Sequence, residues 1–226
     1  MGNLFARKAT NIIRILLNSH PRTWTARDLA AEAGVALGQA SNVSKALIRE
    51  RLALRDSARS GLKLMAPLDL LKRWAAVHNF AANTKFTEYY SKEDDISRFF
   101  LKFKGKNGPE YAVTGLAGAL LVAPHVRPTN VHIYVKSAED AKKWAGLLDL
   151  TPVEANGNVR FAIAEDAGVF HGAREVNGVR VVSDVQLYVD LLNYPARGEE
   201  AAQILLKTIE KKWNNNNDNN NEQTGI

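Results

Sequence analysis

The sequence of 226 residues predicts a mixed α/β fold in two parts. In the N-terminal third, apolar residues recur at helical spacing. From Tyr111 onward, short runs of β-branched and aromatic residues alternate with helical segments. The length suits two small domains, each able to bury its own core. We place the predicted domains at residues 1–80 and 81–213, and a low-complexity Asn-rich tail at 214–226, which is too polar to bury a core and is predicted to be disordered.

Composition narrows the possible functions. No apolar run approaches the roughly 20 residues that cross a bilayer, and the absence of cysteine excludes a disulfide framework, a thiolate nucleophile and a cysteine zinc site. We therefore expect a cytoplasmic protein without a membrane role. Residues 1–80 contain 13 Lys and Arg against 5 Asp and Glu, whereas residues 81–226 contain 17 against 19. The basic surplus lies in the N-terminal third, as a phosphate-binding surface requires.

The N-terminal third contains three helical segments followed by a hairpin. The segments are a helix in NLFARKATNIIRILLN, a short helix in TWTARDLAAEAG, a third helix in ALGQASNVSKALIRERL and strands in LALRD and LKLM. Thr25, with Asp28 three residues later, predicts a capped start for the second helix. Gly34 supplies the turn before the third helix. This order predicts a winged helix-turn-helix.

Residues 5–66 resemble bacterial winged helix-turn-helix regulators, most clearly in TARDLAAEAGVALGQASNVSKALIRERLALR. The sequence departs from them at Ala36, where a Ser or Thr cap is usual, and at Arg51, where Gly often ends the helix. The resemblance implies that the third helix enters the major groove of DNA.

Two groups of side chains are candidates for DNA binding. Base-reading candidates near the start of the third helix are Gln39, Ser41, Asn42 and Lys45. Phosphate-binding candidates on the wing are Arg55, Arg59 and Lys63. A winged helix that binds protein through a solvated basic face is the alternative.

The C-terminal part predicts a small mixed sheet with helices. Strands are predicted in YAVTG, VHIYVK, VRFAIA and VRVVS, and helices in SAEDAKKWAGLLDL, SDVQLYVDLLN and RGEEAAQILLKTIEKKW. Before them, LDLLKRWAAVHNF predicts a helix that packs under the wing or bridges to the next domain, and His78 is predicted to be a satisfied interfacial histidine. The segment FTEYYSKEDDISRFF predicts a surface helix whose polar face carries Glu93, Asp94 and Asp95.

The stretch TGLAGALLVAPHVRPTNVHIY is similar to the start of a nucleotidyltransferase palm, in which a turn and a helix lead to a strand with two acids one residue apart. Such acids hold divalent ions, which prefer oxygen ligands. Here the two positions fall on Asn130 and His132, which cannot supply the same negative charge. We therefore expect a nucleotidyltransferase-like domain without catalysis, metal or cofactor. An ordinary strand explains His132 equally well.

The segments VVSDVQLYVDLLNYPARGEEAAQILL and YAVTGLAGALLVAP, together with the winged helix, resemble the AbiEi antitoxins of type IV toxin-antitoxin systems over residues 5–210. The matching positions are Gln186, Tyr188, Asp190, Arg197 and Gly198. The resemblance implies that the winged helix binds an operator and represses its operon, while the C-terminal domain serves as the antitoxin. It also implies a functionally paired nucleotidyltransferase toxin, with no direct contact required.

The spacing of this motif predicts a structural role for its polar residues. Gln186 and Asp190 are four residues apart and share one face of a helix capped by Ser183. Arg197 is near enough in sequence to fold back on Asp190, and we expect that ion pair to join two helices.

The leading hypothesis is a DNA-binding regulator of the antitoxin type. Because one recognition helix covers only a short half-site, we expect it to bind inverted repeats as a dimer or cooperatively. Two alternatives stay open. One is a nucleotidyltransferase that uses the displaced acids Glu165, Asp166 or Asp184, and the other is a regulator that senses a small ligand in its second domain.

Overall fold

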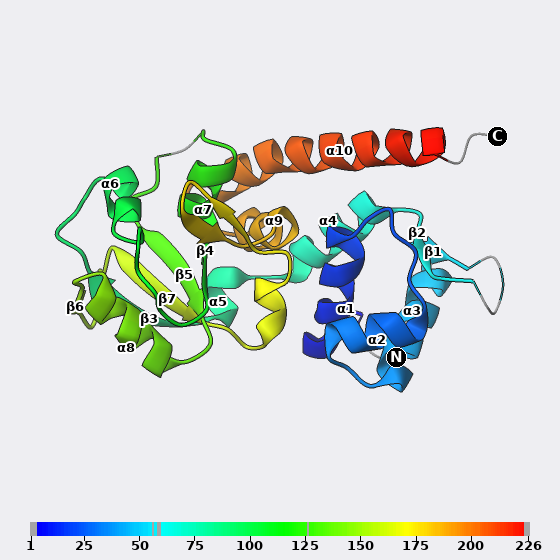
Figure 1. Ribbon diagram of the computed structural model, residues 1–226, viewed down its shortest axis with the longest axis horizontal. Coiled ribbons are helices and arrows are strands. Elements are labelled where there is room, and N and C mark those ends of the chain that lie inside the picture. Colours follow the sequence, from blue (N-terminus) through cyan, green and yellow to red (C-terminus); the bar gives the residue numbers. More distant parts are fainter. Residues whose placement is uncertain (1–3, 56, 58–59, 126, 224–226) are drawn as a thin grey trace. The chain divides into compact units, whose positions relative to one another are not determined.

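The structure is a computed structural model that describes residues 4–55, 57, 60–125 and 127–223 (Figure 1). The chain divides into two compact units, Met1–Val77 with Leu206–Ile226, and His78–Leu205. A seven-stranded mixed sheet lies in the second unit, so the predicted mixed α/β class is confirmed. Among the described residues, none of the helices has both the length and the apolar character needed to cross a bilayer.

The first unit begins with three helices and a short hairpin. Its elements in chain order are α1 (Arg7–Asn18), α2 (Ala26–Ala33), α3 (Leu37–Arg49), β1 (Ala53–Leu54), β2 (Lys63–Leu64) and α4 (Pro67–Val77). The two strands pair antiparallel, and Trp24 adds an antiparallel bridge to Leu62 through backbone hydrogen bonds of 3.0 and 2.7 Å. Ile12, Leu29 and Leu47, one from each of the first three helices, are completely buried. The helices and strands predicted for this region are therefore confirmed as elements.

The ends of these helices follow local sequence signals. The Thr25 hydroxyl accepts a hydrogen bond from the backbone N–H of Asp28 at 3.2 Å and caps α2, which ends at Gly34 with a left-handed φ of 62°. Both signals were predicted. Ala36 begins α3 without a side-chain cap, and Arg51 adopts a left-handed φ of 59° just after the helix, where glycine is usual. The fold accommodates both departures from the winged-helix pattern.

The long C-terminal helix α10 (Gly198–Gln223) belongs to the first unit from Leu206 onward. Leu206, Ile209 and Trp213 are buried, and the Trp213 ring meets the His20 ring edge-on with centroids 5.5 Å apart. The helix continues to Gln223, inside the segment for which composition predicts disorder, and that expectation stays a prediction.

The second unit is built on a sheet with the strand order β6-β3-β7-β5-β4-β9-β8. Its elements in chain order are α5 (Phe80–Asn83), β3 (Lys85–Tyr90), α6 (Ile96–Leu101), β4 (Tyr111–Thr114), α7 (Gly115–Val122), β5 (Val131–Val135), α8 (Ala138–Leu147), β6 (Thr151–Pro152), β7 (Val159–Ile163), the 3-10 helix η1 (Ala167–Phe170), β8 (Arg174–Val176), β9 (Val179–Val181) and α9 (Asp184–Leu192). β5 runs parallel to β7 and β4 runs parallel to β9, whereas the other neighbours are antiparallel. The four predicted strands are confirmed as β4, β5, β7 and β9.

One prediction for this unit is wrong. The segment expected to form a surface helix begins instead with strand β3, which pairs with β7 over five residues, and α6 starts only at Ile96. Aromatic and Thr side chains suit a pleated, half-buried surface, and β7 offers partners for the β3 backbone. The acids expected on a helix face precede α6. Asp95 caps it by accepting a hydrogen bond from the N–H of Arg98 at 3.0 Å.

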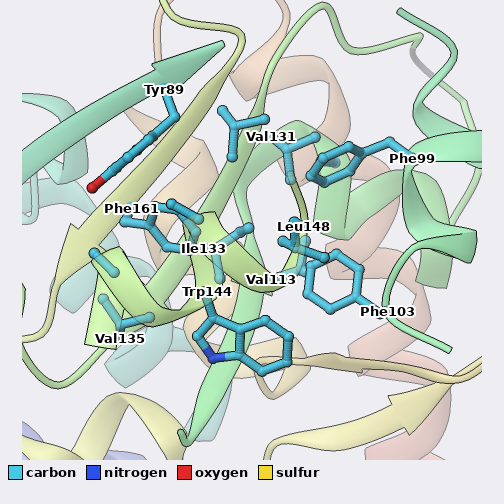
Figure 2. Close-up of a cluster of buried hydrophobic side chains, with 14 of the residues drawn as sticks. Tyr89, Phe99, Phe103, Val113, Val131, Ile133, Val135, Trp144, Leu148 and Phe161 are labelled. Atoms are coloured by element: carbon cyan, nitrogen blue, oxygen red, sulfur yellow. The ribbon is translucent and has the colours of Figure 1, made fainter. Parts of the chain in front are cut away.

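The two faces of the sheet have different chemistry. On one face, alternate residues of β5 join the main apolar cluster with α6 and α8, as Figure 2 shows for Val131, Ile133 and Val135 beside Phe99 and Trp144. Since successive side chains of a strand point to opposite faces, the two residues between these valines and isoleucine, 132 and 134, lie on the other face. That face carries most of the polar residues of the candidate site.

Candidate functional site

The exposed face of α3 is the first candidate site. Its inward face consists of Ala40, Val43, Ser44 and Leu47, which are all buried. Of the four predicted base-reading residues, Asn42 and Lys45 are exposed, while Gln39 and Ser41 are half-buried at the two flanks. Helical geometry therefore places Asn42 and Lys45 nearer than Gln39 and Ser41 to the centre of the outward face.

A groove runs between the first turn of α1 and one flank of α3, with a volume of about 470 Å³. The residues that line it are Leu4, Ala6, Ala9, Gln39, Asn42, Val43, Lys45, Ala46 and Arg49. Three of the four predicted base-reading residues are brought together here, and Ser41 is not among the lining residues. Arg49, which the sequence did not single out, extends the positive charge of Lys45 along the groove.

The hairpin carries the predicted wing residues. Lys63 is exposed on β2, and Arg55 is half-buried just after β1. The Nε of Arg55 is buried and has no hydrogen-bond partner within the described part of the chain. Arg59 lies outside the described residues. Lys63 is also close enough to His20 for its charge to act on that ring. Burial, and secondly this positive charge, hold the pKa of His20 below its usual value of 6.5.

The second candidate site is a buried polar network around Asp190 of α9. The Asp190 side chain is fully buried, and its Oδ2 accepts a hydrogen bond from Thr114 Oγ1 at 2.6 Å. Its Oδ1 accepts hydrogen bonds from Gln186 Nε2 at 2.7 Å and Tyr134 Oη at 3.2 Å, and lies 3.2 Å from His78 Nε2. The predicted shared face of Gln186 and Asp190 is confirmed, as is the Ser183 cap, which accepts from the N–H of Gln186 at 3.2 Å.

The sequence did not identify the other partners of Asp190. Thr114 is 76 residues away along the chain, and His78 is 112 residues away. His78 was expected to be a satisfied interfacial histidine, and the contact with Asp190 shows that it has a partner. Helical spacing reveals a partner four residues away, but no periodic signal in a single sequence links positions this distant.

The predicted ion pair between Arg197 and Asp190 does not form. Arg197 is exposed at the start of α10, and its guanidinium binds Glu200 in a two-pronged pair, with Nε–Oε2 at 2.7 Å and Nη2–Oε1 at 2.8 Å. Glu200 is three residues further along the chain, in the first turn of α10, whereas Asp190 is enclosed by its own donors. Gly198 has a different role, because a Cβ there would come within 2.5 Å of the Leu191 carbonyl oxygen. Tyr188, the remaining motif residue, is buried.

His132 occupies a buried position on the same face of the sheet. Its ring packs against the rings of Phe80, Phe86 and Tyr194, with centroids 5.5, 5.6 and 5.3 Å away, and its buried Nδ1 has no hydrogen-bond partner among the residues that the structure describes. Gly115, with a left-handed φ of 63°, lies against this nitrogen: a Cβ at Gly115 would be 3.4 Å from Nδ1. Burial, and secondly the positive charge of Arg160, lower the pKa of His132 to about 3. The imidazole is therefore neutral near neutral pH.

His132 belongs to a row of polar residues that crosses the sheet. The strand register places Thr114, His132, Arg160 and Glu88 on successive strands β4, β5, β7 and β3. Arg160 Nε lies 3.4 Å from Glu88 Oε1, close enough for an ion pair although the geometry is not that of a hydrogen bond. The row connects the buried Asp190 network, through Thr114, to the partly exposed Arg160 and Glu88. Asn130 lies just before β5 and is half-buried.

The displaced acids of the enzyme alternative have structural partners. Asp184 pairs with Arg174, and Asp166 caps η1 by accepting a hydrogen bond from the N–H of Gly168 at 2.7 Å. Glu165 is exposed. Within the described part of the chain, no three or more His, Asp and Glu side chains group together in a way that could hold a metal ion.

We expect Asp190→Asn to lower the free energy of unfolding by about 3 kcal/mol, because the new amide turns a donor toward groups that already donate and removes the charge they stabilise. Arg197→Ala should change stability little, since its pair with Glu200 is exposed. Urea unfolding followed by circular dichroism measures both. Equal losses in the two variants would contradict the network described for Asp190.

His132 should make the protein less stable in acid. Its folded pKa of about 3 lies below the unfolded value of 6.5, so the unfolded chain binds the proton first as pH falls. When the pH falls from about 6.5 to about 4.5, protonation of His132 in the unfolded chain therefore lowers the free energy of unfolding by about 2 kcal/mol. In His132→Phe, which keeps an aromatic ring in the cage, the loss over that interval should be smaller by this amount. Urea titrations at the two pH values test it, and parallel losses in both proteins would show that His132 titrates normally.

Comparison with known proteins identifies the family of this chain. The sequence model of a family described as "Transcriptional regulator, AbiEi antitoxin, Type IV TA system" matches residues 63–211, about two thirds of the chain. The matched range begins in β2 and contains the whole Asp190 network, while α1, α2 and α3 precede it. No curated protein and no solved structure matches the chain. The chain therefore belongs to the AbiEi family of transcriptional regulators and antitoxins of type IV toxin-antitoxin systems.

Proposed function

We propose that this protein binds the operator of its own operon in the cytoplasm, represses transcription, and acts as the antitoxin to a nucleotidyltransferase toxin. The observation that carries the proposal is the family match over residues 63–211, joined to a basic three-helix and hairpin unit at the N-terminus. In this proposal residues 1–80 are a winged helix-turn-helix DNA-binding domain and residues 81–213 are the antitoxin domain.

The first unit supports a DNA-binding role through its element order and its charge. Three helices are followed by a hairpin whose sheet is extended by Trp24, so α3 takes the place of a recognition helix and the β1–β2 hairpin that of a wing. We propose that Asn42 and Lys45, together with the flanking Gln39 and Ser41, contact base edges. Arg55, Arg59 and Lys63 then bind phosphates and set the position of the protein on the duplex.

The second unit supports an antitoxin role without nucleotidyl transfer. Where a nucleotidyltransferase palm would have a strand with two acids, this chain has Asn130 and His132, and the imidazole is neutral inside an aromatic cage. Such a position contributes packing and no negative charge to a divalent ion. We propose that the domain has a nucleotidyltransferase-like fold and that the matching toxin carries out the chemistry, with no direct contact between the two proteins.

The DNA-binding proposal predicts a salt effect. Binding to a duplex carrying the promoter region of the protein's own operon should weaken with rising salt, because each bound phosphate releases counterions. Replacing Arg55, Arg59 and Lys63 with Ala should reduce the slope of log affinity against log salt by about 0.9 for each phosphate that is no longer neutralised, roughly 2 to 3 in total. Fluorescence anisotropy over a salt series measures it. An unchanged slope would exclude the hairpin as a wing.

The antitoxin proposal predicts that repression and protection separate. Cells that express a nucleotidyltransferase toxin encoded beside this gene should grow again when this protein is produced from an unrelated promoter. The triple Ala variant of the hairpin, which should bind the operator more weakly and repress less, should protect equally well because in this proposal protection resides in the second unit. Growth rate with and without toxin induction is the measurement. A failure of the wild-type protein to restore growth would refute the antitoxin role while leaving operator binding to be judged by the salt series.

A further inference from the structure

Neither the packing nor the backbone conformation of the first unit requires a glycine at position 38, in the first turn of α3. Apart from its chain neighbours and the nearby backbone of α3, a Cβ built at this position meets no atom of the described residues within 4 Å, and the φ of Gly38 lies outside the left-handed range that favours glycine. Glycine lowers helix stability relative to alanine because it loses more backbone freedom on folding. Other glycines of the first unit do have internal reasons. Gly34 adopts a φ of 62°, and a Cβ at Gly61 would lie 3.1 Å from Trp24 N.

The position of Gly38 on α3 is informative. Residues 38, 42, 45 and 49 follow one another at intervals of four, three and four, so they form one stripe along the helix. This stripe lies opposite the buried face, and all four residues are exposed. The outward stripe of α3, defined as Gly38, Asn42, Lys45 and Arg49, therefore begins with a residue that has no side chain and continues with an amide and two cations.

The charges on the outward stripe are available to an outside partner. Arg49 has only a loose ion pair with Glu50, with Nε–Oε1 at 3.8 Å and both side chains about half exposed. Such an exposed pair contributes little and gives way readily to a phosphate. Lys45 and Arg49 also line the groove beside α1, so the positive charge continues from the stripe into a concave surface. A polyanion with a regular surface complements this arrangement.

We infer that Gly38 is the point at which operator DNA approaches the α3 backbone most closely, with Asn42 reading a base edge and Lys45 and Arg49 following the same strand toward its phosphates. This inference rests on the proposed DNA-binding function and refines it. A helix in the major groove contacts bases through its N-terminal residues, and a glycine there lets the backbone come within contact distance of the duplex. Gly38 and Arg49 are thereby added to the DNA-contacting surface of α3. The centre of this surface lies on the outward stripe, and Gln39 and Ser41 lie at its edges.

The test is Gly38→Ala, because stability and binding should then change in opposite directions. The melting temperature should rise by a few degrees, since alanine is the better helix former and its methyl group meets nothing in the protein. Affinity for the promoter duplex should fall by about tenfold or more, because the methyl group occupies the space that DNA requires. Differential scanning calorimetry and fluorescence anisotropy measure the two effects.

Gly146→Ala is the matched control. Gly146 lies on the exposed side of α8 in the second unit, one turn after Lys142, and a Cβ there also meets nothing within 4 Å. The melting temperature should rise as it does for Gly38→Ala, and promoter affinity should stay as in the wild type. Arg49→Gln should weaken promoter binding and lower the salt slope by about 0.9, the value of a single phosphate contact.

Three results would overturn the inference. If Gly38→Ala bound the promoter as tightly as the wild type, the duplex would not approach this residue. If Gly38→Ala lowered the melting temperature, the fold itself would require the glycine. If the wild-type protein showed no preference for the promoter over a mixed-sequence duplex of equal length, the proposed operator binding would fail and the inference with it. The first two results would leave operator binding intact, so a failure of the Gly38 inference can be distinguished from a failure of the proposed function.

Discussion

The Asp190 carboxylate is the constraint on which the second unit depends. A buried carboxylate is costly unless its oxygens are filled by donors. Here the donors come from the end of β4, the middle of β5 and the preceding turn of α9, and His78 also lies within contact distance at the start of the unit. Moving any one of these elements would leave the carboxylate partly unsatisfied. The network therefore fixes α9 against the sheet with a directional precision that apolar contacts lack.

The same face of the sheet encloses His132, one of the two positions that the sequence led us to compare with the metal-binding acids of a nucleotidyltransferase. His132 is next to Thr114 in the strand register and is enclosed by three aromatic rings. The cage favours the neutral imidazole, because a charged ring would lose its hydration without gaining a carboxylate partner. Gly115 belongs to this arrangement, since it leaves room for the His132 ring at the turn into α7. These residues pack together around a neutral imidazole.

The first unit is organised differently, around an exposed surface. The buried face of α3 is apolar apart from Ser44, whose hydroxyl donates to the Ala40 carbonyl of the preceding turn at 2.8 Å. Packing therefore fixes the rotation of the helix and decides which side chains face outward. The outward stripe and the groove beside α1 share Asn42, Lys45 and Arg49, so a partner at one also touches the other. This surface belongs to residues 1–80, the part of the chain in which Lys and Arg outnumber Asp and Glu.

Features that depend on near neighbours along the chain could be predicted from the amino-acid sequence. They are the Thr25 and Ser183 caps, four strands of the sheet and the pairing of Gln186 with Asp190, and the family could be predicted as well. Packing between distant segments makes residues 85–90 a strand and brings Thr114, Tyr134 and His78 together at Asp190. It also encloses Asp190, so Arg197 pairs with its near neighbour Glu200 and not with Asp190. The physical reason is distance along the chain. A cap or a helical pair lies within four residues and leaves a periodic signal, whereas contacts across 56 to 112 residues arise only once packing has placed the strands and helices.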